Sequence, residues 1–159
     1  MDEMNGSERL MQIQESLPRH PDGSQFTPFQ WIGGEDAVRG LTDRFYDLME
    51  LEPRFAILRG VHGNSLDTAR DRLFWFLCGW LGGPQHYMER FGHPRLRARH
   101  LPFAIGVVER DQWLACMEQA MKDLSVPDGL QVFLRQQFAG TADWMRNQPE
   151  PAGTPSGAA

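Results

Sequence analysis

Apolar side chains recur at helical spacing in the first well-patterned segment of the chain, residues 35–51. They fall every three or four positions, at Val38, Leu41, Phe45, Leu48 and Met49. This period places side chains on one face of a helix. Acidic residues open the segment and Pro53 follows it, as expected at the two ends of a helix. We predict a helix over 35–51.

Three later segments show the same period, over 66–81, 109–124 and 129–146. The first of these follows a candidate cap at Asn64 or Ser65 and ends at a Gly-Gly-Pro sequence. Its last two turns are apolar on almost every side, which predicts a position between two layers or against a large apolar ligand. Valine and isoleucine are scarce, and no alternating run of strand length occurs. The fold class is therefore predicted to be all-α.

The two ends of the chain lack this pattern. Residues 1–25 and 148–159 are polar and contain several prolines and glycines, so we predict flexible tails. A single folded domain is expected over 26–147, in a chain of 159 residues that is long enough to bury a core. No internal repeat is visible.

Composition narrows the range of partners and locations. The net charge of -5 gives no global reason to expect nucleic acid or a membrane surface as partner. The N-terminus has no signal-peptide pattern, and no apolar run approaches the roughly 18 residues of a membrane span, so we predict a cytoplasmic protein. Cys78 and Cys116 lie in apolar, helix-like runs, which predicts buried free thiols instead of a disulfide or a metal clip.

Four histidines lie in the predicted domain: His62, His86, His93 and His100. The last three are spaced seven apart, which on an unbroken helix would place them on one face and suggest a metal site. A glycine and a proline flank His93 and break that helix. We therefore interpret His86 and His93 as caps or surface residues.

His100 has a different setting. Arg95, Arg97 and Arg99 precede it, and an apolar run begins at Leu101. This combination suits a haem, because the imidazole can bind the iron, the apolar side chains can line the porphyrin, and the arginines can pair with its two propionates. This pattern alone leaves zinc, haem and a purely structural histidine open, and the arginines could equally form a solvated basic face or a phosphate patch.

Several spaced motifs together resemble the truncated haemoglobins of group II, over roughly 29–146. They are Gly33-Gly34, RFYDLM at 44–49, GWLGGP at 79–84, Tyr87, GHPRLRARHLPF at 92–103, and ERDQWL with Cys116-Met117 at 109–117. The resemblance implies a two-over-two helical sandwich that encloses haem b. In this family's order the helices are a reduced A at 27–32, B at 35–51, E at 66–81, F at 94–101, G at 109–124 and H at 129–146.

The resemblance also assigns the residues at the iron. His100 matches the proximal ligand, whose second ring nitrogen is expected to be held by a carbonyl. Tyr46 and Trp113 match the polar residues that face the gas on the distal side. His62, at the turn before the predicted helix 66–81, would add a third polar group there, as a further donor if it carries a proton toward the ligand.

Further residues match the walls of the haem pocket. Apolar neighbours of the haem are expected at Phe45, Ala69, Leu73, Leu77, Trp80, Phe103 and Met117. Ala69 is too small to gate the site or donate a hydrogen bond. Arg72 and Tyr87 match propionate contacts, and Arg97 or Arg99 would add to them.

These residues predict a haem protein that binds oxygen, nitric oxide and carbon monoxide reversibly, with peroxide and sulfide as further candidate ligands. Two hydrogen bonds to the ligand would make oxygen binding tight, which suits transport poorly. The alternative is a haem enzyme, a nitric oxide dioxygenase or a peroxidase. No flavin or nicotinamide motif is present, so such an enzyme would need a separate reductase. The chain is expected to be a monomer or a homodimer.

Overall fold

The computed structural model describes residue 19 and residues 21–149. Within them the chain forms α2 (Pro28–Ile32), α3 (Glu35–Leu51), the 3-10 helix η1 (Pro53–Phe55), α4 (Ala56–Val61), α5 (Asp67–Trp80), α6 (His86–Phe91), α7 (Leu96–His100), α8 (Val107–Asp123) and α9 (Asp128–Trp144). The only β pairing in this part of the chain is an isolated bridge between Arg19 and Gln25. The prediction of an all-α fold is confirmed.

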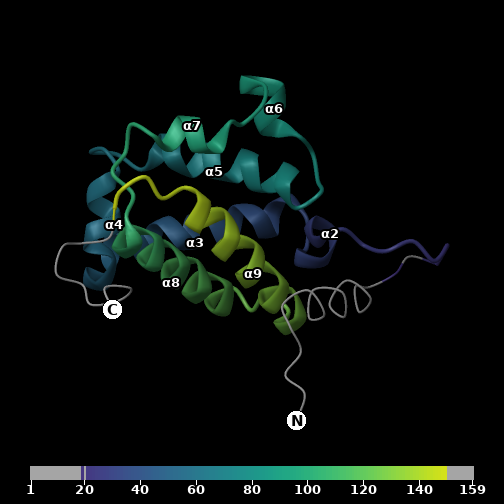
Figure 1. The fold of residues 1–159 in the computed structure, drawn as a ribbon. Helices are drawn as coiled ribbons and strands as arrows, with labels where there is room; N and C mark the ends of the chain where they lie inside the picture. Colours follow the sequence, from purple (N-terminus) through teal and green to yellow (C-terminus); the bar gives the residue numbers. More distant parts are fainter. Residues whose placement is uncertain (1–18, 20, 150–159) are drawn as a thin grey trace, which may run out of the picture.

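The four long helices form two packed pairs (Figure 1). Helix α3 packs against α5, and α8 packs against α9, while contacts between α3 and α8 join the pairs. The short helices α6 and α7 lie on the side of α5 that faces away from α3. This is the predicted two-over-two arrangement. It places α5 between two layers, as its all-round apolar surface indicated.

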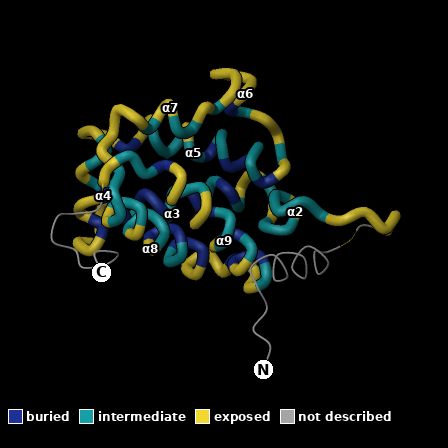
Figure 2. Tube along the Cα trace, in the orientation of Figure 1, coloured by how far each residue is buried: buried dark blue, intermediate teal, exposed yellow. Residues whose placement is uncertain are grey.

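The hydrophobic core lies between the long helices. Its fully buried side chains include Val38, Leu41, Phe45, Leu77, Met117, Met121, Leu130 and Leu134. Figure 2 shows buried positions along α3, α5, α8 and α9, whereas most of α6 and α7 is exposed or only partly buried. The long helices therefore form the core by packing on one another, and the short helices α6 and α7 lie at its edge.

The predicted long helices agree with the structure to within two residues at each end. The start of α5 differs in its cap, because Leu66 occupies the N-cap position and Ser65 Oγ instead accepts a hydrogen bond from Asp67 N at 3.2 Å. Helices η1, α4 and α6 were not predicted, because six residues or fewer are too short to show a period. The predicted tails, 1–25 and 148–159, lie largely outside the described residues.

The glycine pair after α5 allows α2 to pack closely. Gly82 has a positive φ of 94°, and a Cβ at Gly83 would lie 2.5 Å from the ring of Phe29. Phe29 N also donates to Leu81 O at 2.9 Å, so α2 is fastened to the end of α5. The pair therefore serves close packing as well as ending the helix.

The two cysteines are buried free thiols, as predicted. Burial raises the pKa of Cys78 to about 11 and that of Cys116 to about 12. Cys116 Sγ donates to Phe45 O at 3.2 Å. Both thiols therefore stay protonated and unreactive at neutral pH. No helix among the described residues is long and apolar enough to cross a membrane.

Candidate functional site

The site is centred on His100, the last residue of α7. Its Nδ1 lies 2.7 Å from Leu96 O. A carbonyl can only accept, so Nδ1 carries the proton and Nε2 keeps a free lone pair. Metal-binding histidines are commonly held in this way by a carbonyl on the second ring nitrogen. The predicted carbonyl on the second ring nitrogen is therefore present, and it leaves Nε2 free.

The segment after α9 holds α7 and the loop that follows it. Asn147 Nδ2 donates to His100 O at 3.2 Å and to Phe103 O at 2.7 Å, and Asn147 Oδ1 accepts from Ile105 N at 3.0 Å. Arg97 Nη1 donates to the carbonyls of Trp144 and Arg146. Sequence reasoning missed Asn147, which lies at the end of the predicted domain and shows no pattern of its own.

Two polar aromatic side chains come from the long helices. Tyr46 on α3 is 5% exposed, and Trp113 on α8 is partly buried. Both pack on the ring of Phe45, with centroids 5.0 Å and 5.2 Å away. Burial raises the pKa of Tyr46, so its hydroxyl remains a donor at any physiological pH. Neither the Tyr46 hydroxyl nor the Trp113 indole nitrogen is hydrogen-bonded to another described residue.

His62 lies beside Tyr46, at the C-terminal end of α4. Its ring meets that of Tyr46 edge to face, with centroids 5.9 Å apart, and its Nδ1 donates to Leu58 O at 3.0 Å. Burial lowers the pKa of His62, and the nearby positive charge of Arg59 lowers it further. The imidazole is therefore neutral at pH 7, with its lone pair on Nε2. This corrects the expectation of a third donor, because the one N–H of the neutral ring is already taken by Leu58.

The expected apolar residues divide into two groups. Ala69, Leu73 and Trp80 on α5 are partly exposed beside the core, and Trp80 stacks on Phe138 with centroids 4.9 Å apart. The second group, Phe45, Leu77 and Met117, is fully buried in the core. Phe103 is 45% exposed, and its ring centroid lies 6.5 Å from that of His100.

Three of the four expected propionate contacts gather near α6. The Arg99 guanidinium lies 5.4 Å from the ring centroid of Tyr87, and both Arg99 and Arg72 lie over Phe91. Arg97 is the exception. Its guanidinium is turned to the C-terminal end of α9, so of the pair Arg97 and Arg99 only Arg99 lies beside Tyr87.

The other two histidines lie apart from His100. His86 Nε2 is 2.6 Å from Glu35 Oε1, and exposed His93 accepts at Nδ1 from Arg95 N at 3.2 Å. No group of three His, Cys, Asp or Glu side chains that could hold a metal ion occurs in the part of the chain that the structure describes.

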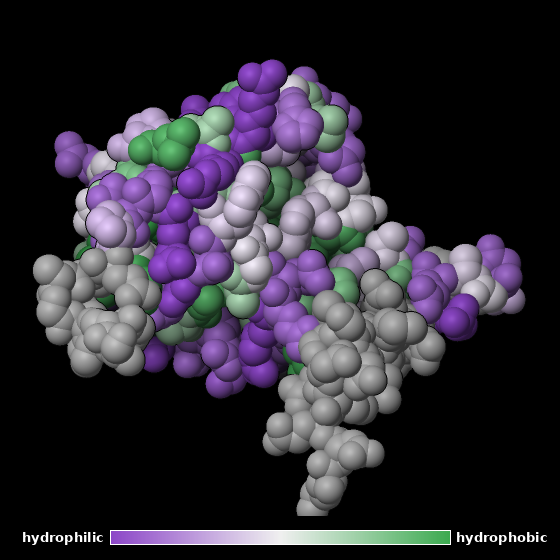
Figure 3. Space-filling model, in the orientation of Figure 1, coloured by the Kyte–Doolittle hydropathy of each residue, from purple (hydrophilic) through white to green (hydrophobic). Residues whose placement is uncertain are grey.

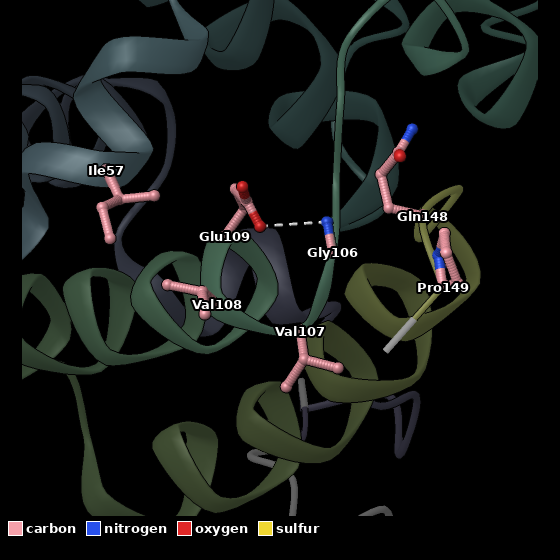
Figure 4. A pocket seen from close by; sticks show the side chains of 7 residues that line it. All are labelled: Ile57, Gly106, Val107, Val108, Glu109, Gln148 and Pro149. Carbon is pink, nitrogen blue, oxygen red and sulfur yellow. Dashed lines mark hydrogen bonds between the residues drawn. The ribbon is translucent and has the colours of Figure 1, made fainter. Parts of the chain in front are cut away.

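Two surface hollows are lined by residues other than His100. Figure 4 shows one of about 270 Å³ at the start of α8, where Glu109 accepts from Gly106 N at 3.0 Å beneath Ile57. A second, of about 220 Å³, lies between α8 and α9 and is lined by Met117 and Phe138. Both are smaller than the roughly 300–1,000 Å³ of typical ligand pockets. Neither is lined by His100, Tyr46 or His62.

Comparison with known proteins decides the family. Residues 27–147 match the bacterial-like globin family. The chain belongs to this family. It is 37% identical to the Group 2 truncated hemoglobin YjbI of Bacillus subtilis over 77% of this chain and 90% of that protein. It is therefore a group II truncated haemoglobin, as the sequence motifs indicated.

Solved structures of group II globins have the same fold. The 2-on-2 hemoglobin of Agrobacterium tumefaciens is 38% identical with a TM-score of 0.77, covering 79% of this chain and 97% of that one. The truncated oxygen-avid haemoglobin of Bacillus subtilis is 36% identical with a TM-score of 0.71, covering 77% of this chain and 100% of that one.

The residues of this globin fit the haem that its family implies. His100 offers a free Nε2, partly buried apolar side chains line α5, and cations lie beside Tyr87. Tyr46 and Trp113 supply donors that the described protein residues leave unpaired. This combination of one fixed imidazole, an apolar wall and unpaired donors suits a haem with a gas ligand better than a zinc ion, which takes four protein ligands in structural sites.

Proposed function

We propose that this globin binds haem b through His100 and holds oxygen tightly on the opposite side, next to Tyr46 and Trp113. The observation that carries the proposal is the orientation of His100, whose Nδ1 donates to Leu96 O and leaves Nε2 for the iron. The bound haem would supply the iron to which oxygen, nitric oxide or carbon monoxide binds. The oxygen-avid relative from Bacillus subtilis supports tight oxygen binding.

Tyr46 and Trp113 would set the rate of oxygen release. Both keep their protons, and both are positioned by packing on the buried ring of Phe45. Each hydrogen bond to a charged acceptor contributes about 1.5 to 3 kcal/mol, which corresponds to roughly a ten- to hundredfold slower release. Carbon monoxide draws less charge and gains less from these donors. The protein is thus suited to chemistry or sensing of oxygen more than to its transport.

The experiment is a stopped-flow measurement of oxygen release from the haem-loaded ferrous protein. Tyr46→Phe and Trp113→Phe should each speed oxygen release at least tenfold while changing carbon monoxide release much less. Phe76→Leu, on α5 but without a polar atom, is the matched control. If the unmodified protein releases oxygen fast, and neither Tyr46→Phe nor Trp113→Phe changes that rate, tight oxygen binding by these donors is disproved.

A second candidate function, as a haem enzyme with nitric oxide dioxygenase or peroxidase activity, is favoured by His62. Its neutral Nε2 can accept a proton beside the ligand site, as a peroxidase base must. Turnover with peroxide, or with nitric oxide and a separate reductase, should fall at least tenfold in His62→Ala. Unchanged turnover in His62→Ala would rule out this role of His62 and leave ligand binding as the remaining candidate function.

A further inference from the structure

An arginine-rich surface covers the side of the molecule on which α6 and α7 lie. Residues 72–103 contain five arginines, one glutamate, and neither lysine nor aspartate, a net charge of +4 in a chain whose total is -5. Four of these arginines are exposed: Arg72, Arg90, Arg95 and Arg99. We use the name arginine surface for these four arginines together with the exposed apolar residues among them, Met88, Phe91, Leu101 and Phe103. The rest of the chain is therefore strongly acidic, and its positive charge is concentrated here.

These arginines differ from those elsewhere in the molecule. Among the described residues, seven arginines pair with carboxylates: Arg39, Arg44, Arg59, Arg70, Arg110, Arg135 and Arg146. No arginine between 72 and 103 forms such a pair within this part of the chain. Their charge is thus not neutralised by the protein's own carboxylates. The haem propionates would engage Arg72 and Arg99, which leaves the charges of Arg90 and Arg95 available to a partner.

Two of the exposed arginines are nevertheless held in place by contacts within the protein. Arg90 donates to His86 O at 3.1 Å and lies 4.3 Å from the Trp75 ring, and Arg99 Nε donates to Pro94 O at 2.8 Å. Side chains that are already ordered lose less entropy when a partner binds. This arrangement is therefore better suited to docking than a set of free, fully solvated cations.

Apolar side chains lie among the arginines. Four of the ten large hydrophobic residues exposed in the described chain are Met88, Phe91, Leu101 and Phe103, with exposed fractions of 46, 38, 56 and 45%. Figure 3 shows apolar side chains among hydrophilic ones along the edge where α6 and α7 lie. Arginine, methionine and aromatic residues are enriched at protein interfaces, whereas lysine is depleted. The composition favours a protein partner over a lipid surface or a nucleic acid.

We propose that the arginine surface docks an acidic electron-transfer protein that reduces the haem iron. This inference rests on the proposed function. The surface includes the segment that ends in His100, so a partner docked there lies beside the haem site. One electron would pass from the reduced partner to ferric iron, giving ferrous iron and the partner oxidised by one electron. Opposite charges would steer the two proteins together and make the rate depend on salt.

The probe is a reduced plant-type ferredoxin, an acidic one-electron donor, mixed with the ferric haem-loaded globin under carbon monoxide. Reduction is followed through the Soret band. The second-order rate should fall at least tenfold between about 0.01 M and about 1 M salt, where the Debye length shrinks from about 30 Å to about 3 Å. At low salt, Arg90→Glu with Arg95→Glu should lower the rate at least tenfold, and the two glutamine substitutions should have an intermediate effect.

The matched control is Arg44→Glu with Arg135→Glu, which changes the net charge equally on α3 and α9. Its rate should stay within threefold of the unmodified protein. Equal losses in both double variants, or a rate that salt does not change, would overturn the docking surface. A second outcome would also overturn the docking surface. In that outcome the unmodified protein binds phosphatidylserine vesicles or duplex DNA, the variant Arg90→Glu with Arg95→Glu does not, and the rate of reduction by ferredoxin does not depend on salt.

Dithionite separates this inference from the function on which it rests. The globin could take up haem, be reduced by dithionite and bind carbon monoxide, yet show no effect of salt or of the arginine substitutions on its reduction by ferredoxin. That result would keep the proposed function and overturn only the docking surface. Failure to take up haem at all would overturn both.

Discussion

The two sides of the proposed haem site are built in different ways; we call the side of Tyr46 and Trp113 distal and the side of His100 proximal. On the distal side, Tyr46 and Trp113 belong to helices of 17 residues and are positioned by Phe45 at the centre of the core. On the proximal side, His100 ends a helix of five residues without a buried side chain, which Asn147 and Arg97 tie to the end of α9. The distal groups are therefore fixed by hydrophobic packing, and the proximal histidine by a few hydrogen bonds across the surface.

The strongest test of this contrast removes the ring that supports both distal residues. Phe45→Ala should lower the free energy of unfolding by about 3–5 kcal/mol, because it opens a cavity in the core. Phe103→Ala, which removes a 45% exposed ring on the proximal side, should cost less than about 1 kcal/mol. Urea unfolding at a fixed haem content measures both. Equal losses would contradict the contrast.

The next largest effect is expected at the glycine turn that follows α5 and leads toward the segment of His100. Gly83→Ala would place a Cβ 2.5 Å from the Phe29 ring and should cost about 1–3 kcal/mol through overpacking. Gly140 in α9 has open space, and Gly140→Ala should instead stabilise the protein by about 0.5–1 kcal/mol. Thermal unfolding of the two variants should shift in opposite directions, and a shift of both in the same direction would show that α2 is not tightly packed there.

A smaller effect is expected where the proximal side is held by hydrogen bonds. Asn147→Ala leaves the Phe103 carbonyl and the Ile105 N–H without their partner, although His100 O still accepts from Phe103 N, and it should lower the free energy of unfolding by about 1–2 kcal/mol. Haem release to an acceptor globin should become roughly ten- to hundredfold faster, as for other residues that orient a metal ligand. Asn64→Ala, at an exposed asparagine outside this hydrogen-bond network, is the control. Normal haem release in Asn147→Ala would show that α7 holds His100 unaided.

The smallest effect concerns pH and the distal side. His62 has a pKa below 6.5 in the folded protein, so the unfolded chain binds more protons as the pH falls, and stability falls with it. Between about pH 7.5 and about pH 5.5, the unmodified protein should therefore lose more stability than His62→Gln. Parallel pH profiles from urea unfolding would mean that His62 is not buried as a neutral ring.

The same contrast explains what the sequence could predict. The distal side belongs to long helices, whose period is visible in the sequence, so α3, α5, α8 and α9 were predicted within two residues and Tyr46 was placed on the correct helix. His100 was predicted as the iron ligand from its motif. Its partner Asn147 is 47 residues away and belongs to no periodic pattern, and the tautomer of His62 depends on a carbonyl in an unpredicted helix. Contacts between distant segments become visible only in the fold.

The position of Asn147 has a consequence for where the domain ends. All of the long helices are complete by Trp144, so a version of the chain cut after Met145 would keep every buried apolar side chain and still fold by that measure. It would lose the side chain that fastens the loop below His100. The functional boundary of this globin therefore lies beyond its last helix, and fusions or deletions designed from helix limits alone would disturb the proximal side first.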